Sequence, residues 1–255
     1  MSEKLLVSII TVSFNSAETI KDTINSVINQ NYRPIEYVFV DGQSNDDTLM
    51  IIKSFIPTFM EHNIRIKIIS EKDDGLYDAM NKGIKISEGG IICILNSDDF
   101  YTHNAVISKV VDKMSMSDCV ISNLKYVNRY NVNKVERVWK TKVGKFIFGW
   151  NPPHPSTFFT REVYLKYGLY RTDLRISSDY DFLFRTIHIN KIRVSYLNDY
   201  VVSMRNGGES TKNIRSNLVG NMEIYDILKI HKQRFKIFII TARFLNKAFQ
   251  FKIKK

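Results

Sequence analysis

The sequence predicts an α/β protein with a mostly parallel sheet and helices on both of its faces. In the first hundred residues, four apolar runs alternate with three segments of helical periodicity, and this order is typical of a parallel sheet. Polar and acidic residues follow the apolar runs, and the ends of parallel strands meet at one sheet edge, where ligands bind. Apolar residues make up 44% of the 255-residue chain, which excludes a disordered or fibrous protein.

The strands of the first half are expected to be buried on both faces, because their apolar runs are continuous rather than alternating. The runs cover residues 5–12, 35–40, 64–69 and 91–95. Asn15 and Glu18 are spaced as a capping box, which predicts a helix that begins near Asn15. Two further helices are expected over residues 46–59 and 77–84.

The second half is less regular and continues the same domain. Helices are expected at residues 104–114, 179–188 and 215–230, and strands at 119–126, 135–139, 156–159, 192–197 and 201–204. No proline-rich or serine-rich linker interrupts the chain before its composition changes near Lys232. We therefore expect one domain over residues 1–231, with halves at 1–100 and 101–231, and a tail over residues 232–255.

The C-terminal tail carries most of the net charge. Eight of the eleven net positive charges fall between Lys232 and Lys255, a segment without acidic residues. A nucleic-acid-binding body is therefore not expected. Apolar residues recur at helical spacing from Phe235 to Phe251, which predicts an amphipathic helix that lies on an anionic membrane surface. The alternative is a last helix packed on the body with its charges in solvent.

Membrane-spanning and disulfide-stabilised structures are not expected. The sequence has no run of about 18 apolar residues, which a spanning helix needs. Cys93 and Cys119 are the only cysteines, and they are expected to be small core residues of a cytosolic protein. No glycine-rich phosphate loop follows the first strand, so NAD binding and P-loop chemistry are not expected.

Carboxylates after the second and fourth strands are candidates for ligand binding. Asp98 and Asp99 follow an apolar strand directly and are hard oxygen ligands suited to Mn²⁺ or Mg²⁺, with a helix N-cap as the alternative. Asp41 ends the second strand, where an acid can accept hydrogen bonds from a nucleotide base or ribose. The alternative for Asp41 is a residue of an Asp-Gly turn.

Four ordered segments resemble the family 2 glycosyltransferases, an inverting family with the GT-A fold. They are SIITVSFN at residues 8–15, VDGQSNDDT at 40–48, EKDDGLYDAMNKG at 71–83 and LNSDD at 95–99. The third is similar to the bacterial members that build surface polysaccharides such as O-antigen and capsule. The resemblance extends from Val7 to about Gly208, and it implies a nucleotide-sugar-binding half followed by an acceptor-binding half.

The resemblance implies a donor site on the first half and on a closing loop. The positions that it assigns to the donor are Thr11, Ser13, Asn15, Asp41, Asp73, Gly75, Asn81, Lys82, Asn96, Asp98 and Arg205. Asn96 stands where the family has the first acid of an Asp-x-Asp motif, and its amide can still bond a ribose hydroxyl. The metal is assigned to Asp98 or Asp99, with Asp98 favoured. Arg205 begins a glycine loop that would contact the diphosphate, with an ordinary surface loop as the alternative.

The resemblance places the catalytic base in ISSDYDFLFR, residues 176–185. Asp179 takes the base position, and Ser178 replaces the acid that usually precedes it. Asp181 is the competing base and a candidate acceptor-binding residue. His154 begins HPSTFF, which is similar to a strand that lines the acceptor site, although a lone histidine is as often structural.

The resemblance implies a metal-dependent, inverting hexosyltransferase that forms a β-glycosidic bond. By resemblance, the donor is expected to be UDP-glucose or UDP-galactose and the acceptor a saccharide linked to undecaprenyl diphosphate. The enzyme is expected in the cytoplasm, peripheral on the inner face of the membrane. Two alternatives stay open. One is a non-catalytic sugar-nucleotide-binding module, suggested by Asn96 and Ser178, and the other is a nucleotidyltransferase, which would ordinarily carry a glycine-rich basic loop after the first strand.

Overall fold

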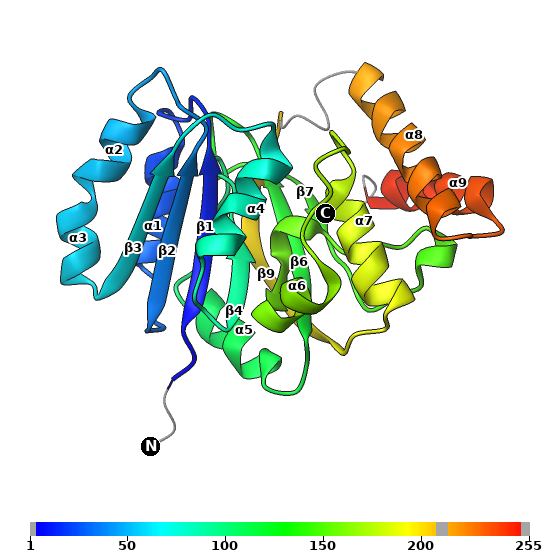
Figure 1. Cartoon of the computed structure of the whole chain (residues 1–255), viewed down its shortest axis with the longest axis horizontal. Coiled ribbons are helices and arrows are strands. Elements are labelled where there is room, and N and C mark those ends of the chain that lie inside the picture. Colours follow the sequence, from blue (N-terminus) through cyan, green and yellow to red (C-terminus); the bar gives the residue numbers. More distant parts are fainter. Residues whose placement is uncertain (1–3, 208–213, 251–255) are drawn as a thin grey trace.

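A nine-stranded sheet runs through the protein, with helices packed on both of its faces (Figure 1). The computed structural model describes residues 4–207 and 214–250. The strand order is β3-β2-β1-β4-β8-β6-β9-β5, and β7 pairs with β6 outside this path. The predicted α/β architecture with helices on both faces is confirmed.

Four parallel strands form the first half of the sheet. They are β3 (Ile64–Ser70), β2 (Ile35–Asp41), β1 (Val7–Ser13) and β4 (Ile91–Ile94). Every residue of β1, β2 and β4 is buried, as continuous apolar runs predict. The register pairs Ser13 with Asp41 and Asp41 with Ser70, so three of these strands end at one level. The predicted strand positions are confirmed to within two residues.

Four helices connect these strands: α1 (Ile20–Ile28), α2 (Thr48–Ser54), α3 (Ile56–Glu61) and α4 (Leu76–Ile86). The prediction that the first helix begins near Asn15 is wrong. Asn15 has a left-handed backbone (φ 49°) and its side chain accepts a hydrogen bond from Asn45, so the helix begins five residues later. The second predicted helix is two helices, because Pro57 has no N–H with which to continue the first.

In the described part of the second half, the chain adds five strands and five helices. They are β5 (Phe100–Tyr101), α5 (Val106–Met114), β6 (Cys119–Val127), β7 (Val135–Trp139), β8 (Thr157–Thr160), α6 (Arg161–Tyr167), α7 (Ser178–Leu183), β9 (Val194–Arg205), α8 (Ile214–Ile230) and α9 (Lys236–Gln250). Short helical turns lie at η1 (Phe146–Phe148), η2 (His154–Ser156) and η3 (Phe184–Ile189).

Two expectations for this half are wrong, and two elements were not expected. The strands predicted at 192–197 and 201–204 are one strand, β9, whose register against β6 shifts on both sides of Asn123. The helix predicted over 179–188 ends at Leu183 and continues as the π-helical turn η3. The sequence pattern does not predict α6 or the two-residue strand β5.

Each face of the sheet buries its own hydrophobic core. One core forms beneath α1, α3 and α5, and the other forms beneath α4, α6 and α7. Cys93 lies in the first core and Cys119 in the second, and both are free thiols. The expectation that the cysteines are core residues is therefore confirmed.

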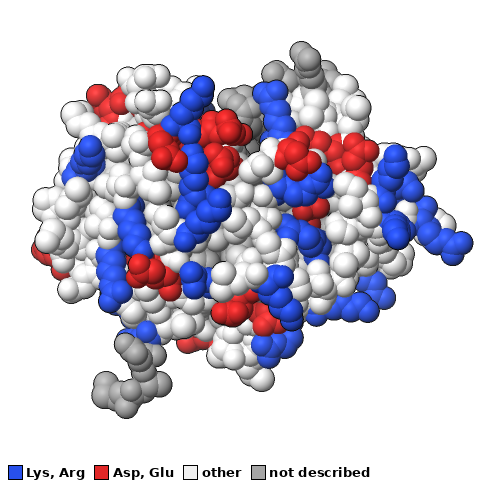
Figure 2. Space-filling model, in the orientation of Figure 1, with Lys and Arg blue, Asp and Glu red and all other residues white. Residues whose placement is uncertain are grey.

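The last helix, α9, packs on the body and still presents apolar side chains to solvent. Ile239 is 1% exposed in the second core. Gly149 (φ 73°) lets α9 approach closely, because a Cβ there would lie 2.3 Å from the backbone nitrogen of Arg243. Phe235 and Phe238 are more than half exposed, and basic side chains gather at the same right-hand edge (Figure 2). No helix within the described residues is long and apolar enough to cross a membrane, and residues 251–255 of the predicted tail lie outside them.

A buried carboxylate ties neighbouring parts of the parallel sheet together. Glu36 of β2 accepts hydrogen bonds from the hydroxyl of Ser8 (2.5 Å) and the backbone N–H of Glu88 (2.9 Å). Its other oxygen lies 2.8 Å from Nζ of Lys67 on β3. Burial opposes the ionisation of Glu36, but these partners outweigh burial and hold its pKa below the ordinary value.

Replacing Glu36 by Gln is expected to lower the free energy of unfolding by about 1.5–3 kcal/mol, because hydrogen bonds to a charged group contribute that much. The folded pKa of Glu36 lies below its unfolded value of about 4.3. The stability difference is therefore full above that pH and is lost as the pH falls through the folded value. Urea denaturation of both proteins between neutral and acidic pH measures it.

Glu88→Gln is the matched control for this experiment. Glu88 also pairs with Lys67, but its side chain is 61% exposed, so its loss should change stability by less than about 1 kcal/mol. A stability gap between Glu36→Gln and the wild type that does not depend on pH would contradict the prediction.

Candidate functional site

Asp41 lies at the carboxyl end of β2, between the ends of its two neighbouring strands. Its carboxylate accepts hydrogen bonds from the hydroxyls of Ser13 on β1 (3.2 Å) and Ser70 on β3 (2.8 Å). It also accepts one from the backbone N–H of Ser44 in the following loop (3.0 Å), and the side chain is fully buried. Three chain segments therefore meet on one carboxylate at the edge of the sheet, as the parallel order predicts.

Asp73 and Lys82 form a charged cluster beside Asp41. Nζ of Lys82 lies 2.7 Å from Asp73 and 2.9 Å from Glu71. These partners raise the pKa of Lys82, whereas burial raises the pKa of Asp73 despite the nearby lysine. A Cβ added to Gly42 would lie 3.0 Å from the Asp73 carboxylate, so the cluster lies against the loop after Asp41. Figure 2 shows acidic and basic side chains together at this upper edge, where the parallel strands end.

Asn15 and Gly75 shape the loops at the same edge. The backbone N–H of Asn15 donates to the Ser44 hydroxyl (2.9 Å), and its side-chain oxygen accepts from the N–H of Asn45 (2.9 Å). The loops after β1 and β2 are thereby joined. Gly75 precedes α4 with φ 107°, which favours glycine, and the space beside its Cα is open.

Thr11 and Asn81 are placed inside the fold rather than at this edge. The Thr11 hydroxyl is fully buried, 3.1 Å from that of Tyr37, two residues before β1 ends. The Asn81 amide donates to the carbonyl of Tyr170 (2.8 Å) and accepts from the N–H of the same residue (3.0 Å). The structure therefore does not gather these two candidates around Asp41, and Asn81 attaches the second half of the chain to α4.

The turn after β4 carries both acids of the expected metal site. Asp99 is fully buried and accepts a hydrogen bond from the Asn96 amide (3.0 Å), and burial together with the charge of Asp98 raises its pKa well above the ordinary range. The Oδ1 atoms of Asp99 and of the Asn96 side-chain amide have no hydrogen-bond partner among the described residues. Asp98 is half-buried. Within residues 4–207 and 214–250, no three His, Cys, Asp or Glu side chains form a metal-binding group.

Arg205 holds this turn from the end of β9. The side chain is 3% exposed, donates to the backbone carbonyl of Asp98 (2.6 Å) and pairs with Asp22 of α1. Thr23 of α1 donates to the carbonyl of Asp99 (2.7 Å). Arg205 therefore positions the backbone of the Asp98 turn from within the fold. The glycine loop that it begins continues at Gly208, which lies outside the described residues.

Asp179 stands in the first turn of α7 and lines an open cavity of about 680 Å³. Its carboxylate lies 3.2 Å from the hydroxyl of Tyr77, which donates to the carbonyl of Ile176 (2.7 Å). Burial and the charge of Asp179 raise the pKa of Tyr77 well above its ordinary value, so this hydroxyl keeps its proton. A partly exposed carboxylate at a cavity wall can accept a proton from a bound hydroxyl group.

Asp181 lies two positions further along α7 and is 1% exposed. Its oxygens lie 3.3 Å from Nε of Arg185 and 3.6 Å from Nε2 of His231, and Arg171 is 3.9 Å away. Asp181 is not among the residues that line the cavity of Asp179. The two competing acids are thus separated by environment, one on a cavity and the other in a buried ionic cluster.

His154 is buried in an aromatic cluster. Its Nε2 lies 2.7 Å from the hydroxyl of Tyr170, whose oxygen is 3.2 Å from the hydroxyl of Tyr164. Burial lowers the pKa of His154, against the opposing charge of Asp179, so the imidazole is held neutral. The ring of Tyr170 in turn packs against Tyr77 of α4 and Phe182 of α7, with ring centroids 5.8 and 4.8 Å away.

Glu223 of α8 is a positioning residue that the sequence analysis did not identify. Its carboxylate accepts hydrogen bonds from the backbone N–H groups of Arg175 (2.8 Å), Ile176 (3.0 Å) and Ser177 (2.8 Å). These three residues lead directly into the turn that carries Asp179. No spacing in the sequence links an acid on a helix to a loop 46 residues earlier, so only the folded chain reveals the contact.

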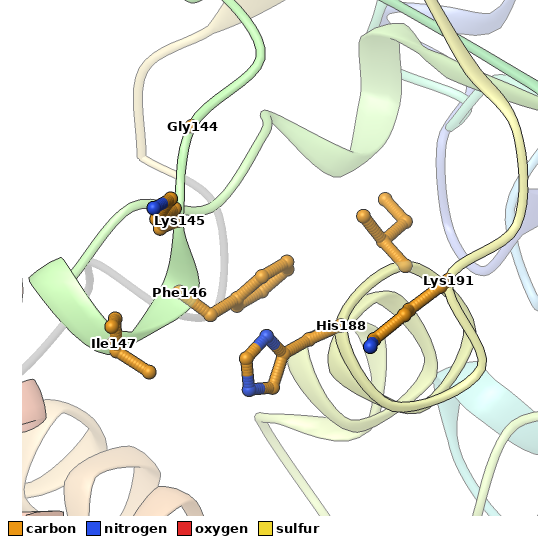
Figure 3. Close-up of a pocket in the computed structure, with 7 residues that line it drawn as sticks. Gly144, Lys145, Phe146, Ile147, His188 and Lys191 are labelled. Atoms are coloured by element: carbon orange, nitrogen blue, oxygen red, sulfur yellow. The ribbon is translucent and has the colours of Figure 1, made fainter.

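A second, smaller cavity of about 270 Å³ adjoins the first, with which it shares Gly144 and Lys145. In Figure 3, the rings of Phe146 and His188 lie toward one another between the loop and the turn after α7, with Lys191 beside them. Their ring centroids are 5.9 Å apart. None of the residues expected to bind a substrate or metal lines this cavity.

Comparison with known proteins gives a consistent family. The chain matches Glycosyl transferase family 2 over residues 8–174. It is 31% identical to an uncharacterized glycosyltransferase of Mycobacterium tuberculosis over 189 residues, which cover 72% of this chain and 70% of that protein. A PGL/p-HBAD biosynthesis glycosyltransferase of Mycobacterium bovis is 26% identical over 211 residues, which cover 79% of this chain and 77% of that protein.

Solved structures share the fold at low sequence identity. S. aureus TarS 1-349 in complex with UDP-GlcNAc gives a TM-score of 0.65 at 18% identity, and the match covers 97% of this chain and 76% of the TarS 1-349 chain. The mannosyltransferase PcManGT from Pyrobaculum calidifontis, in complex with GDP-Man and Mn²⁺, gives a TM-score of 0.68 at 17% identity. The match covers 97% of this chain and 71% of the PcManGT chain. The predicted GT-A architecture is therefore confirmed.

Replacing Glu223 by Ala is expected to loosen the loop before Asp179. Amide hydrogen exchange across residues 170–180 should rise about 10- to 100-fold, because each hydrogen bond to a charged group contributes a corresponding protection. Peptide-level exchange measured by mass spectrometry tests this. Asp226→Asn removes an exposed acid from the same helix and is the matched control, for which exchange should not change. Equal exchange in Glu223→Ala and the wild type would contradict the proposal that Glu223 positions this loop.

Proposed function

The chain belongs to glycosyl transferase family 2, and from that premise we propose that it transfers a hexose from a UDP-sugar to a saccharide acceptor with inversion at the anomeric carbon. One observation carries the proposal: α4 links the two sides of the site. Its Lys82 holds Asp73 against the Asp41 loop, and its Tyr77 contacts Asp179. Five residues of helix span about 7.5 Å, so the donor edge and the candidate base are close enough for one substrate pair.

The donor is proposed to be UDP-glucose or UDP-galactose. Base and ribose are assigned to the loops that carry Ser13, Asp41, Asp73 and Asn96, which lie at the carboxyl ends of the parallel strands. UDP-GlcNAc bound to TarS and GDP-Man bound to PcManGT support a nucleotide-sugar donor, since both proteins share this fold. Lys82, which is paired with Asp73, is assigned to the same donor site.

The divalent cation, Mn²⁺ or Mg²⁺, is assigned to Asp98. Asp98 fits because it is half-buried, whereas burial favours the neutral form of Asp99. The unpartnered oxygens of Asn96 and Asp99 indicate a turn whose polar groups the described chain does not fully satisfy. Few protein ligands leave coordination positions for diphosphate oxygens. When bound, the cation offsets the charge that develops on the leaving diphosphate.

Asp179 is proposed as the general base. It accepts the proton of the acceptor hydroxyl, whose oxygen attacks the anomeric carbon from the side opposite the leaving nucleoside diphosphate. The Tyr77 hydroxyl, 3.2 Å away, orients the carboxylate. One base is sufficient, because the diphosphate leaves without needing a proton. A donor with an α linkage then gives a β-linked product.

The acceptor is proposed to be a lipid-linked saccharide, such as one on undecaprenyl diphosphate, in O-antigen or capsule assembly. The enzyme would then work in the cytoplasm, on the inner face of the membrane. The exposed Phe238 and Leu245 of α9, and Phe235 just before it, support this proposal, because apolar and basic side chains on one helix suit an anionic membrane surface. Ile239 anchors that helix to the body.

Asp179→Asn is expected to lower the single-turnover rate about 10²- to 10⁴-fold, since it removes the base, while the affinity for UDP is retained. Mass spectrometry over a panel of nucleotide sugars with Mn²⁺ first identifies the donor, and calorimetry measures UDP binding.

EDTA should abolish transfer by the wild type, and Mn²⁺ should restore it.

Asp181→Asn is the matched control for Asp179→Asn. Because Asp181 is buried beside Arg185 and His231, its loss should lower the melting temperature and leave the turnover of the folded enzyme near that of the wild type. Full turnover by Asp179→Asn would exclude Asp179 as the base. Full activity in EDTA would exclude a role for a divalent cation in the transfer reaction.

The double variant Phe238→Ser/Leu245→Ser is expected to bind vesicles of phosphatidylglycerol and phosphatidylcholine about ten-fold more weakly than the wild type, because it removes two exposed apolar side chains from α9. Co-sedimentation measures this binding. Met60→Ser/Met116→Ser changes two apolar residues elsewhere that are even more exposed, and it is the matched control. Equal binding of all three proteins, or binding that salt does not weaken, would refute the membrane proposal.

A further inference from the structure

The charged residues that line the cavity beside Asp179 are mainly basic. Five basic side chains belong to its described wall: Arg137, Lys140, Lys142, Lys145 and Arg243. Asp179 is the one acid among the described lining residues. Cations that line a concave site attract anions and raise their local concentration. Binding of a neutral saccharide acceptor would not require this positive charge on the cavity wall.

Arg243 of α9 differs from the lysines of this wall because its guanidinium is held in place. It lies 4.3 Å from the ring centroid of Tyr180, next to Asp179 in α7. Burial lowers the pKa of Arg243, although Tyr180 and the charge of Asp179 oppose that effect. Its Nε is buried and has no hydrogen-bond partner among the described residues. A buried donor without a partner is destabilising, and a ligand that accepts its hydrogen bond would relieve the cost.

The packing of α9 fixes the position of Arg243. The Asn246 amide donates to the carbonyl of Phe148 (3.0 Å), and Ile239 is buried in the core. Gly149 allows the backbone of α9 to approach, since a Cβ there would overlap the backbone nitrogen of Arg243. The guanidinium is therefore part of a built wall and not of a loose tail.

We propose that Arg243 binds a phosphate or diphosphate ester carried by the acceptor, beside the hydroxyl that Asp179 deprotonates. A guanidinium presents a planar fork of donors, Nε included, that matches phosphate oxygens. Trp139 and Trp150 line the same cavity and can cover a sugar ring. The assignment to the acceptor rests on the proposed role of Asp179, whereas anion binding rests on the geometry of Arg243 alone.

The test measures the binding of inorganic pyrophosphate to the full chain by calorimetry. EDTA is present, so the donor site has no metal with which to hold a diphosphate. Arg243→Gln should weaken binding about 10- to 100-fold, because it removes charge-assisted hydrogen bonds. Lys236→Gln removes one charge from the same helix outside the cavity wall and should leave the affinity within about two-fold. Asp179→Asn should bind pyrophosphate more tightly than the wild type, because it removes the acid of the wall.

Equal affinity of Arg243→Gln and the wild type for pyrophosphate would overturn the proposal. An equal loss of UDP affinity in the presence of Mn²⁺ would also overturn it, because Arg243 would then belong to the donor site or to the fold. If Arg243→Gln does not fold, Arg243→Lys carries the test, since lysine keeps the charge without the fork and should bind more weakly than the wild type. A normal turnover of Asp179→Asn would refute the proposal that Asp179 is the general base, but it would not change the interpretation of these binding results.

A prenyl diphosphate distinguishes the two sources of such an ester. Tighter binding of citronellyl diphosphate than of pyrophosphate, reduced by Phe244→Ser at the exposed rim, would assign the anion to a lipid-linked acceptor. Equal affinity for the two probes would assign it to a soluble glycan that carries phosphate. Both outcomes retain Arg243 as the residue that binds the ester.

Discussion

The parallel register of β1, β2 and β3 is the constraint on which the proposed donor site depends. It sets Ser13, Asp41 and Ser70 side by side at the strand ends, and Asp41 accepts hydrogen bonds from both hydroxyls. A slip of one residue would turn every side chain of a strand to the opposite face. The buried Glu36, bonded to Ser8 and paired with Lys67, opposes such a slip from the other end of the same strands.

The helix α4 connects these strand ends to the proposed acceptor site. Gly83 allows it to lie unusually close to the sheet, because a Cβ there would come within 2.5 Å of Ile10. From that position Lys82 reaches Asp73 and Tyr77 reaches Asp179. Glu223 fixes the other side of the Asp179 turn through three backbone N–H groups. The proposed base is thus placed by contacts from two helices that are far apart in the sequence.

The sequence predicted the strands of the first half well, but it did not distinguish the environments of neighbouring acids. Continuous apolar runs were enough for β1 to β4, because a strand buried on both faces has no polar alternation. The predicted start of α1 was wrong because the Asn15 side chain accepts a hydrogen bond from Asn45 of a distant loop instead of capping a helix. Asp179 and Asp181 have nearly the same sequence context, and only the tertiary cluster of Arg185 and His231 separates their environments.

The two sequence-based interpretations of the C-terminal segment describe different faces of one helix. Ile239 is buried in the core, as a packed last helix requires, while Phe238 and Leu245 are exposed, as a membrane-facing helix requires. Arg243 lies on the cavity beside Asp179, so the helix that would touch the membrane also forms a wall of the proposed acceptor site. An acceptor held in a membrane could therefore meet Arg243 and Asp179 without leaving the surface to which α9 is proposed to bind. Removing the whole segment would remove the core contact, the cavity wall and the exposed apolar face together, which is why single side chains separate these roles and a truncation does not.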